Sequence, residues 1–411
     1  MAESMIQELF ADRIGGNRFG KEEKVYKFEK IKRARNAAIS AHPDVELIDM
    51  GVGEPDGAAF PEVVRRLAEE AGKWENRTYA DNGIMAFREA VAEYMGSQYG
   101  VDLDPATEIC HSVGSKNALS MLPAAFINPG DYSLMTIPGY PVLGTHTRYY
   151  GGENYSLPLR EENAFLPDLG QVPNEVANSA KILYLNYPNN PTGATATESF
   201  YDRVIEFALE NKLVVVSDAA YAPLTYDARP LSILSRPRAK ETCVELQSMS
   251  KGFNMTGWRL SWVCGSPLVV RAFETVKDNF DSGQFRAIQL AAAEALENYE
   301  TITPRIVEKY SRRLDLLVAA LREVGFDAKK PGGTFYLYVR APKGIQNGPR
   351  LESAEEVSQH LIREKLVSTV PWDDVGAYLR FSATFVANGM EEEERVVNEV
   401  KHRLGQLNLQ F

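Results

Sequence analysis

The sequence predicts an α/β protein whose large domain is built on a mostly parallel β-sheet. Between residues 107 and 211, short apolar runs alternate with helical segments, which is the pattern of strands joined by crossover helices. Residues 213–218 begin with four apolar residues in a row, as expected of a strand that is buried on both faces. The chain has 411 residues and exceeds the size at which one hydrophobic core keeps growing, so we also expect a second, smaller domain.

The composition favours a folded protein that acts on small molecules. Apolar residues make up 44% of the chain and charged residues 25%, which is ordinary for a globular protein. Acidic side chains outnumber basic ones by 56 to 45, and the net charge of −11 gives no electrostatic footprint for nucleic acid or an anionic membrane. The basic cluster within residues 30–35 is expected to be a solvated helical face.

The cysteines and the N-terminus argue against a zinc-binding, disulfide-rich, secreted or membrane-spanning protein. Cys110, Cys243 and Cys264 lie in apolar runs without CxxC spacing, which argues against a zinc site or a disulfide framework, so we expect reduced core residues and no metal. The N-terminus lacks the basic and apolar regions of a signal peptide, and no apolar stretch approaches membrane-spanning length. The expected location is cytoplasmic.

The most informative stretch runs from Ser248 to Arg259 and reads SMSKGFNMTGWR. Apolar runs on both sides of it predict a loop between two buried strands. Lys251 lies there among small and hydroxyl-bearing residues, where poor solvation of the ammonium would lower its pKa and make it a nucleophile. A lysine that forms a Schiff base with pyridoxal 5'-phosphate (PLP) needs this property, and Ser248, Ser250 and Arg259 would hold the phosphate.

Ser-x-Ser-Lys with an arginine eight positions after the lysine resembles the cofactor-lysine signature of the fold-type I, PLP-dependent aminotransferases. Other landmarks of this family follow in the same order along nearly the whole chain. The resemblance implies a large domain with a mostly parallel seven-stranded sheet flanked by helices, and a smaller α+β domain. The expected bounds are 1–50 for an N-terminal arm and part of the small domain, 51–300 for the large PLP-binding domain, and 301–411 for the C-terminal small domain.

A phosphate site is expected after the strand predicted at residues 109–113. Gly114, Ser115 and Lys116 follow this strand and open a helix. The unpaired N–H groups and the partial positive charge of a helix N-terminus suit a phosphate, so Ser115 and Lys116 should contact it. We also expect Lys116 to contact the substrate.

Two predicted strands, at residues 132–137 and 181–186, lead to residues that should face the pyridine ring. Tyr140 follows the first, and the family stacks an aromatic side chain on the ring at this position. Asn190 follows the second within a turn that is rich in proline, where its amide can donate to the phenolic oxygen of PLP. Tyr221 matches the family tyrosine that shares this task.

Asp218 ends the most clearly buried strand of the chain. A buried carboxylate needs a cationic partner, and the protonated pyridine nitrogen of PLP would be that partner. Asp218 would keep this nitrogen protonated, so that the ring can accept electrons from the substrate Cα. The resemblance makes Lys251, Asp218 and Tyr140 the catalytic residues, with Lys251 as the general base and acid of a ping-pong transamination.

Two segments should bind the amino-acid end of the substrate. A strand predicted at residues 45–50 leads into a glycine-rich turn, where Gly53 matches the family position that faces the substrate carboxylate. Arg380 lies in an apolar strand at residues 378–382, where a bidentate carboxylate contact would explain a cation. This strand and one at 334–339 would belong to the small domain, which a helical region at 284–321 would connect to the large one. Asn190 is a further expected substrate contact.

The family is generally dimeric, and each site is completed by the neighbouring subunit. Tyr79, which precedes a glycine and an arginine-bearing helix, matches the tyrosine that reaches the cofactor phosphate of the partner. We therefore expect a homodimer with shared active sites, whose substrates are small amino acids and 2-oxo acids.

Within the superfamily the chain is most similar to the LL-diaminopimelate aminotransferases. Tyr26 and Asp81 of this chain match residues that help hold the substrate in those enzymes. A carboxylate such as Asp81 would pair with the distal ammonium of diaminopimelate. The resemblance implies amino transfer from LL-diaminopimelate to 2-oxoglutarate, giving tetrahydrodipicolinate and glutamate, as a step of lysine biosynthesis.

Three alternatives compete with this interpretation, and the first two stay open. The cofactor motifs also fit an aminotransferase for alanine, glutamate or aromatic amino acids, and a carbon–sulfur β-lyase on the same fold. A PLP-binding transcriptional regulator would be expected to carry a helix-turn-helix extension and a basic patch, which this acidic chain lacks.

Overall fold

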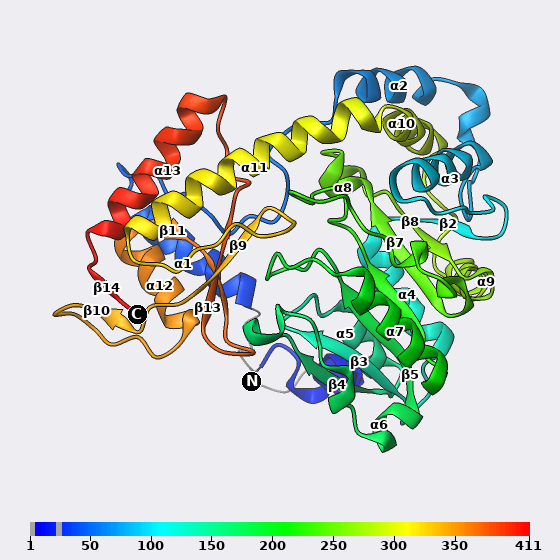
Figure 1. Cartoon of the computed structure of the whole chain (residues 1–411), viewed down its shortest axis with the longest axis horizontal. Coiled ribbons are helices and arrows are strands. Elements are labelled where there is room, and N and C mark those ends of the chain that lie inside the picture. The colour runs from blue at the N-terminus through cyan, green and yellow to red at the C-terminus, as the bar shows by residue number, and fades with distance from the viewer. Residues whose placement is uncertain (1–4, 22–26) are drawn as a thin grey trace.

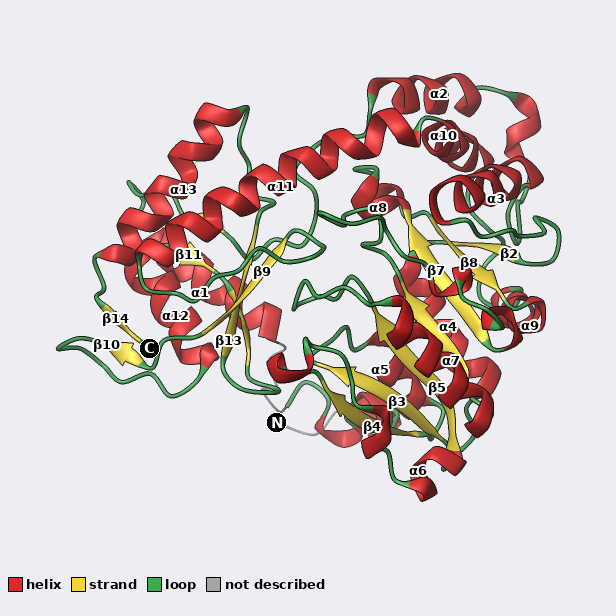
Figure 2. Ribbon diagram, in the orientation of Figure 1, coloured by secondary structure: helices red, strands yellow, loops and turns green. Residues whose placement is uncertain are grey.

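Seven strands form the central sheet of the computed structural model, which describes residues 5–21 and 27–411. The order is β2-β8-β7-β6-β5-β3-β4, and all neighbours are parallel except β8, which is antiparallel to both β2 and β7. The bounds are β2 (Ile109–Ser112), β3 (Tyr132–Ile137), β4 (Glu153–Pro158), β5 (Ala180–Asn186), β6 (Val214–Asp218), β7 (Cys243–Ser248) and β8 (Ser261–Gly265). This sheet confirms the predicted fold class (Figure 2).

Helices cover both faces of this sheet because its strands alternate apolar side chains between two cores. Ile182 and Val216 belong to one apolar cluster, together with residues of α4 (Ser115–Phe126), α5 (Val142–Tyr149) and α9 (Pro267–Lys277). Their neighbours in sequence, Leu183 and Val215, belong to the main core on the opposite face. Three helices that contribute to the main core are α3 (Met85–Tyr99), α7 (Glu198–Asn211) and α10 (Arg286–Glu297).

A second group of elements surrounds a three-stranded antiparallel sheet with the order β12-β13-β9. Its bounds are β9 (Tyr336–Arg340), β12 (Val370–Trp372) and β13 (Tyr378–Ser382). The long helix α11 (Tyr299–Glu323) runs from the α10 end of the molecule to this group (Figure 1). The other helices and strands of this second group are α1 (Lys27–Ala41), β1 (Ile48–Asp49), β10 (Gly344–Ile345), α12 (Ala354–Lys365), β11 (Val367–Ser368), α13 (Met390–Gly405) and β14 (Leu409–Gln410). The domain bounds given above stay a prediction.

Three local expectations are corrected, and one strand was missed. The strand expected at 45–50 is shorter than predicted. Only β1 (Ile48–Asp49) forms there, and it pairs in parallel with β11. The lysine segment is not an open loop, because Lys251 lies in the one-turn helix α8 (Met249–Gly252). The expected helical region at 284–321 divides at Asn298, which separates α10 from α11. The strand β4 was not expected, since only one of its six side chains is buried at the sheet edge and the segment has no apolar pattern.

The cysteines occupy core positions as expected, because all three are buried, and none of them is part of a disulfide among the described residues. None of the helices in the described part of the chain has the length and apolar character needed to cross a membrane. The same residues contain no group of three or more histidine, cysteine or acidic side chains arranged to hold a metal ion.

Candidate active site

A cavity of about 570 Å³ opens where the carboxyl ends of the central strands meet the smaller sheet. In parallel α/β sheets this edge is the usual position of a ligand site. The register of the strands explains the convergence, since Asn186 at the end of β5 pairs with Asp218 at the end of β6. Twelve predicted site residues line this cavity: Gly53, Ser115, Lys116, Tyr140, Asn190, Asp218, Tyr221, Ser248, Ser250, Lys251, Arg259 and Arg380.

Lys251 is held at the cavity by a short capped helix. Ser248 is the N-cap of α8, and its hydroxyl accepts the backbone N–H of Ser250 at 3.1 Å. The Lys251 Nζ atom donates a hydrogen bond of 2.6 Å to the carbonyl oxygen of Gly53. Burial lowers the pKa of this amine to about 8, although the nearby carboxylate of Glu54 acts in the opposite direction. About a tenth of Lys251 is therefore uncharged at pH 7, far more than at the ordinary pKa of 10.5, and this uncharged form is the one that acts as a nucleophile or base.

Asp218 presents a buried carboxylate whose hydrogen-bond donors among the described residues are neutral. Its Oδ2 atom accepts from the hydroxyl of Tyr184 at 3.1 Å, and Oδ1 accepts from the backbone N–H of Ala220 at 3.2 Å. Burial raises the pKa of Asp218 to about 6, against the effect of these two hydrogen bonds. A cationic ring nitrogen in the cavity would supply the missing charge partner, so this residue fits the pyridine nitrogen of PLP.

An anion cradle lies at the N-terminus of α4. Arg259 has a left-handed φ of 58° and donates from Nη1 to the carbonyl oxygen of Thr256 at 2.8 Å. Its guanidinium lies against Gly114, where an added Cβ atom would come within 2.0 Å of Nη2. Only glycine therefore lets this cation approach the first turn of α4, next to Ser115. The cradle fits a phosphate, since it combines a helix N-terminus, a guanidinium and hydroxyl groups.

The position of Arg380 suits the binding of a carboxylate. Its side chain is buried, lies 4.0 Å over the ring of Tyr336, and donates to Asn190 Oδ1 at 2.9 Å and to the carbonyl oxygen of Gly51 at 3.0 Å. Among the described residues its Nε atom has no hydrogen-bond partner. A buried guanidinium held only by neutral acceptors can still bind an anion strongly, which suits the α-carboxylate of an amino acid.

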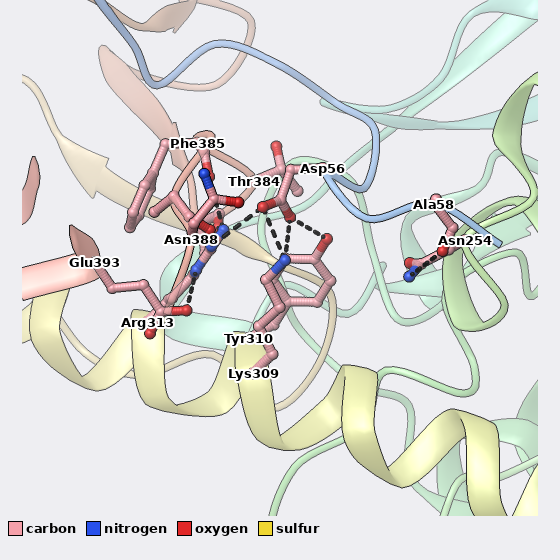
Figure 3. Close-up of polar contacts among 12 residues, drawn as sticks. Asp56, Ala58, Asn254, Lys309, Tyr310, Arg313, Thr384, Phe385, Asn388 and Glu393 are labelled. Atoms are coloured by element: carbon pink, nitrogen blue, oxygen red, sulfur yellow. Dashed lines mark hydrogen bonds and ion pairs between the residues drawn. The ribbon is translucent and has the colours of Figure 1, made fainter. Parts of the chain in front are cut away.

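The turn that holds Gly51 and Gly53 is fixed from behind by a buried ionic network (Figure 3). Asp56 accepts from Lys309 Nζ at 2.7 Å and from the Tyr310 hydroxyl at 3.1 Å, both on α11. Its second oxygen accepts from Arg313, whose Nε donates to Glu393 of α13 at 2.9 Å. The backbone that contacts Lys251 and Arg380 is thereby anchored to two helices of the second group.

Five lining residues that matter were not found from the sequence: Asn186, Thr256, Tyr336, Trp372 and Asp374. Tyr336 forms a hydroxyl pair with Tyr221 at 3.1 Å. Asn186 could have been found from its place at the end of a buried strand. Trp372 and Asp374 follow no motif, because their position depends on how the turn after β12 folds over the cavity.

Two predicted site residues in the described part of the chain, Tyr79 and Asp81, do not line this cavity. Tyr79 is 80% exposed, and Asp81 is exposed with its carbonyl oxygen accepting from Lys277 Nζ at 2.6 Å. Tyr26 lies outside the described residues. The exposure of Tyr79 agrees with its expected role in a neighbouring subunit, and a role for Asp81 would require the same arrangement.

The fold and this cavity define a PLP-dependent transferase of the α/β class. The family described as "Aminotransferase class I and II" matches residues 45–399, and the chain belongs to this family. It is 60% identical, over the full length of both chains, to the LL-diaminopimelate aminotransferase of Methanocaldococcus jannaschii. It is 56% identical, again over both full lengths, to the LL-diaminopimelate aminotransferase of Methanococcus maripaludis.

Solved structures of other proteins have the same fold as this chain. The apo structure of BacF from Bacillus subtilis is 30% identical, with a TM-score of 0.86 over 94% of this chain and 97% of that one. The expected class of enzyme and its cofactor, PLP, are thereby confirmed.

Proposed function

We propose that the protein transfers the amino group of LL-diaminopimelate to 2-oxoglutarate, which gives tetrahydrodipicolinate and glutamate in lysine biosynthesis. The observation that carries this proposal is the identity of 60%, without truncation of either chain, to the Methanocaldococcus jannaschii enzyme of that name. The cavity supports it, because it holds a half-buried lysine, a buried carboxylate and a buried guanidinium in one space. The cytoplasmic location stays a prediction.

Each residue of the cavity has a distinct task in this proposal. PLP, when bound, supplies a ring that accepts electrons from the substrate Cα. Arg380 binds the α-carboxylate and fixes the orientation of the substrate, while Asn190 holds the guanidinium in place. Lys251 Nζ takes the proton from Cα and returns it, and its lowered pKa suits this exchange near neutral pH. Asp218 balances the charge of the ring nitrogen from the end of β6.

The cradle at α4 positions the cofactor. Arg259 and the N-terminus of α4 would hold the phosphate, with Ser115, Ser248 and Ser250 as hydroxyl donors. Tyr140 also lines the cavity and would stack on the ring, and Tyr221 would donate to its phenolic oxygen. Tyr336 and Trp372 line the cavity from the opposite side, where the smaller sheet lies.

The proposed enzyme is a homodimer. Large apolar side chains are exposed near the turn that carries Tyr79, among them Trp74 at 73% and Phe280 at 58%. The segments that contain them lie together, since the Asp81 N–H donates to the Ser282 carbonyl oxygen at 3.1 Å. Exposed apolar surface of this kind is typical of a protein–protein interface, and a second copy there would bury Tyr79.

The experiment that tests the proposed reaction measures glutamate formed by the purified PLP-loaded enzyme from 2-oxoglutarate and a series of amino donors. We expect LL-diaminopimelate to give a kcat/KM far above those of L-alanine and L-phenylalanine. Pyruvate release from L-cystathionine reports β-lyase activity in parallel. A preference for another donor, or lyase activity as the main reaction, would contradict the proposal. Lys251→Ala is the control for background activity.

A further inference from the structure

A buried tyrosine supports the carboxylate of Asp218 from behind the cavity. Tyr184 lies in β5, is inaccessible to solvent, and is not one of the residues that line the cavity. Its hydroxyl donates to Asp218 Oδ2 at 3.1 Å, and among the described residues it is the only side chain that donates to this carboxylate. Tyr184 therefore acts on the cofactor site through Asp218.

The register of the strands places this hydroxyl. Tyr184 pairs with Val216 of β6, two positions before the pair that Asn186 and Asp218 form. Side chains two positions apart in a strand lie on the same face of the sheet, so Tyr184 and Asp218 share one face. The ring of Tyr184 belongs to the apolar cluster with residues of α4 and α5. Packing therefore fixes the ring, and with it the position of the hydroxyl.

The hydroxyl of Tyr184 stays a donor toward Asp218. Burial and the charge of Asp218 raise the pKa of Tyr184 well above its ordinary value, so the phenol keeps its proton. Burial raises the pKa of Asp218 to about 6, while the hydrogen bonds from the Ala220 N–H and from Tyr184 act in the opposite direction. Tyr184 thus makes the Asp218 carboxylate a weaker base than burial alone would.

The basicity of Asp218 decides where a shared proton lies when PLP is bound. An ionised carboxylate favours the proton on the ring nitrogen, whereas a more basic carboxylate takes the proton and leaves the ring neutral. The protonated ring is the better acceptor of electrons from the substrate Cα. We propose that Tyr184 is a positioning residue, whose hydrogen bond to Asp218 keeps the shared proton on the ring nitrogen. The inference requires PLP and does not depend on which amino acid the enzyme uses.

A second buried tyrosine next to the same strand shows a different use of the hydroxyl. Tyr187 follows the end of β5 and is 1% exposed, and its hydroxyl donates to the carbonyl oxygen of Phe165 at 2.7 Å. This acceptor is a neutral backbone group that does not line the cavity. Replacement of Tyr187 by phenylalanine removes a buried hydroxyl without touching Asp218, and so provides a matched control for Tyr184.

The test is the ¹⁵N NMR signal of the holoenzyme loaded with PLP that is labelled at the ring nitrogen. The unmodified protein should give the signal of a protonated ring, and Asp218→Asn supplies the reference for a ring without its carboxylate. In Tyr184→Phe the signal should move toward that of an unprotonated ring. The kcat for any accepted amino donor should fall about tenfold with KM nearly unchanged, because a hydrogen bond to a charged group is lost while Arg380 still binds the substrate.

The controls separate this role from a structural one. Tyr187→Phe should lower Tm and leave the ¹⁵N signal unchanged. A fluorinated tyrosine introduced at position 184 keeps the hydroxyl as a stronger donor, so it should retain the signal of the protonated ring. An unchanged signal in Tyr184→Phe would overturn the inference, and so would the same shift in both phenylalanine variants or an unprotonated ring with the fluorinated tyrosine. None of these outcomes depends on diaminopimelate, so they are distinct from a failure of the proposed substrate.

Discussion

Asp56 and Arg313 form a buried ion pair, with 3.1 Å between Oδ2 and Nη2, that connects the glycine turn of the active site to the long helix α11. Both side chains are almost inaccessible to solvent, with 4% and 0% of their surface exposed. The turn in front of Asp56 supplies the carbonyl oxygens that contact Lys251 and Arg380. The geometry of the catalytic groups therefore depends on an interaction that makes no contact with the cavity.

We predict that Asp56→Ala destabilises the protein by about 3 kcal/mol, because removal of one partner leaves a buried guanidinium incompletely paired. Glu393 still contacts Arg313 and limits the loss. Unfolding in urea measures the change. The exposed pair of Lys401 and Glu323 provides a control, since Glu323→Gln should cost less than about 1 kcal/mol. Equal effects of the two substitutions would contradict a buried anchoring role.

The pKa of Lys251 predicts how cofactor binding depends on pH. Addition of PLP to the cofactor-free protein should form the visible absorption band at a rate that rises with pH and levels off above about 8, because only the uncharged amine reacts. Glu54→Gln should move this midpoint to lower pH, since the carboxylate of Glu54 favours the ammonium. A midpoint near 10.5, the ordinary value, would show that burial does not act on Lys251.

Glu245 predicts a pH dependence of stability that is separate from the active site. Its fully buried carboxylate accepts from the Ser232 hydroxyl at 2.9 Å, and burial raises its pKa from 4.5 to about 7. The folded state thus binds a proton more tightly than the unfolded state. The stability that Glu245 contributes is complete below pH 4.5 and is lost as pH rises through about 7.

The variant Glu245→Gln should remove this dependence. Gln247, which donates to Glu245 Oε1 at 2.8 Å, has an amide oxygen without a partner among the described residues, so its amide can rotate to accommodate the new amide group. Relative to the variant, the unmodified protein should lose up to about 3 kcal/mol of unfolding free energy between pH 5 and pH 8. Urea titrations at these two pH values measure the difference, and parallel behaviour of the two proteins would refute the assignment.

The proposed homodimer with shared active sites predicts complementation between two defective subunits. Lys251→Ala removes the base, and Tyr79→Phe removes a hydroxyl that is expected to reach the phosphate of the partner. Each homodimer should have low activity, whereas a mixture refolded together should recover about a quarter of normal activity, because half of the dimers are mixed and every mixed dimer contains one intact site of two. No recovery in mixed dimers isolated by two affinity tags would place Tyr79 outside the partner's site.

The sequence predicted those parts of the site that lie at the carboxyl ends of strands. Residues 213–218 and 181–186 were recognisable because strands buried on both faces are continuously apolar, and the side chains that end them must then share one edge of the sheet. For the same reason Asp218, Asn190 and Lys251 could be assigned to one cavity. The capped turn of α8 was missed, since only four residues form it and its polar composition resembles that of a loop.

The sequence could not predict residues whose position depends on packing between distant segments. Asp374 and Asp373 are identical neighbours in sequence, and only the docking of the turn on α12 decides which of them caps the helix. Asp56 likewise resembles an ordinary turn residue until α11 supplies its three partners, Lys309, Tyr310 and Arg313. Tyr79 and Asp81 were assigned by resemblance, and a single chain leaves both exposed.

The measurement that tests the central claim most directly is the absorption spectrum of the PLP-loaded protein before and after addition of LL-diaminopimelate without any oxo acid. We predict rapid loss of the visible band of the bound cofactor and its return on addition of 2-oxoglutarate, whereas Lys251→Ala shows neither change. A band that ignores diaminopimelate but responds to another amino acid would contradict the proposed substrate. A protein that forms no such band with PLP would contradict the assignment of Lys251 and of the whole cavity.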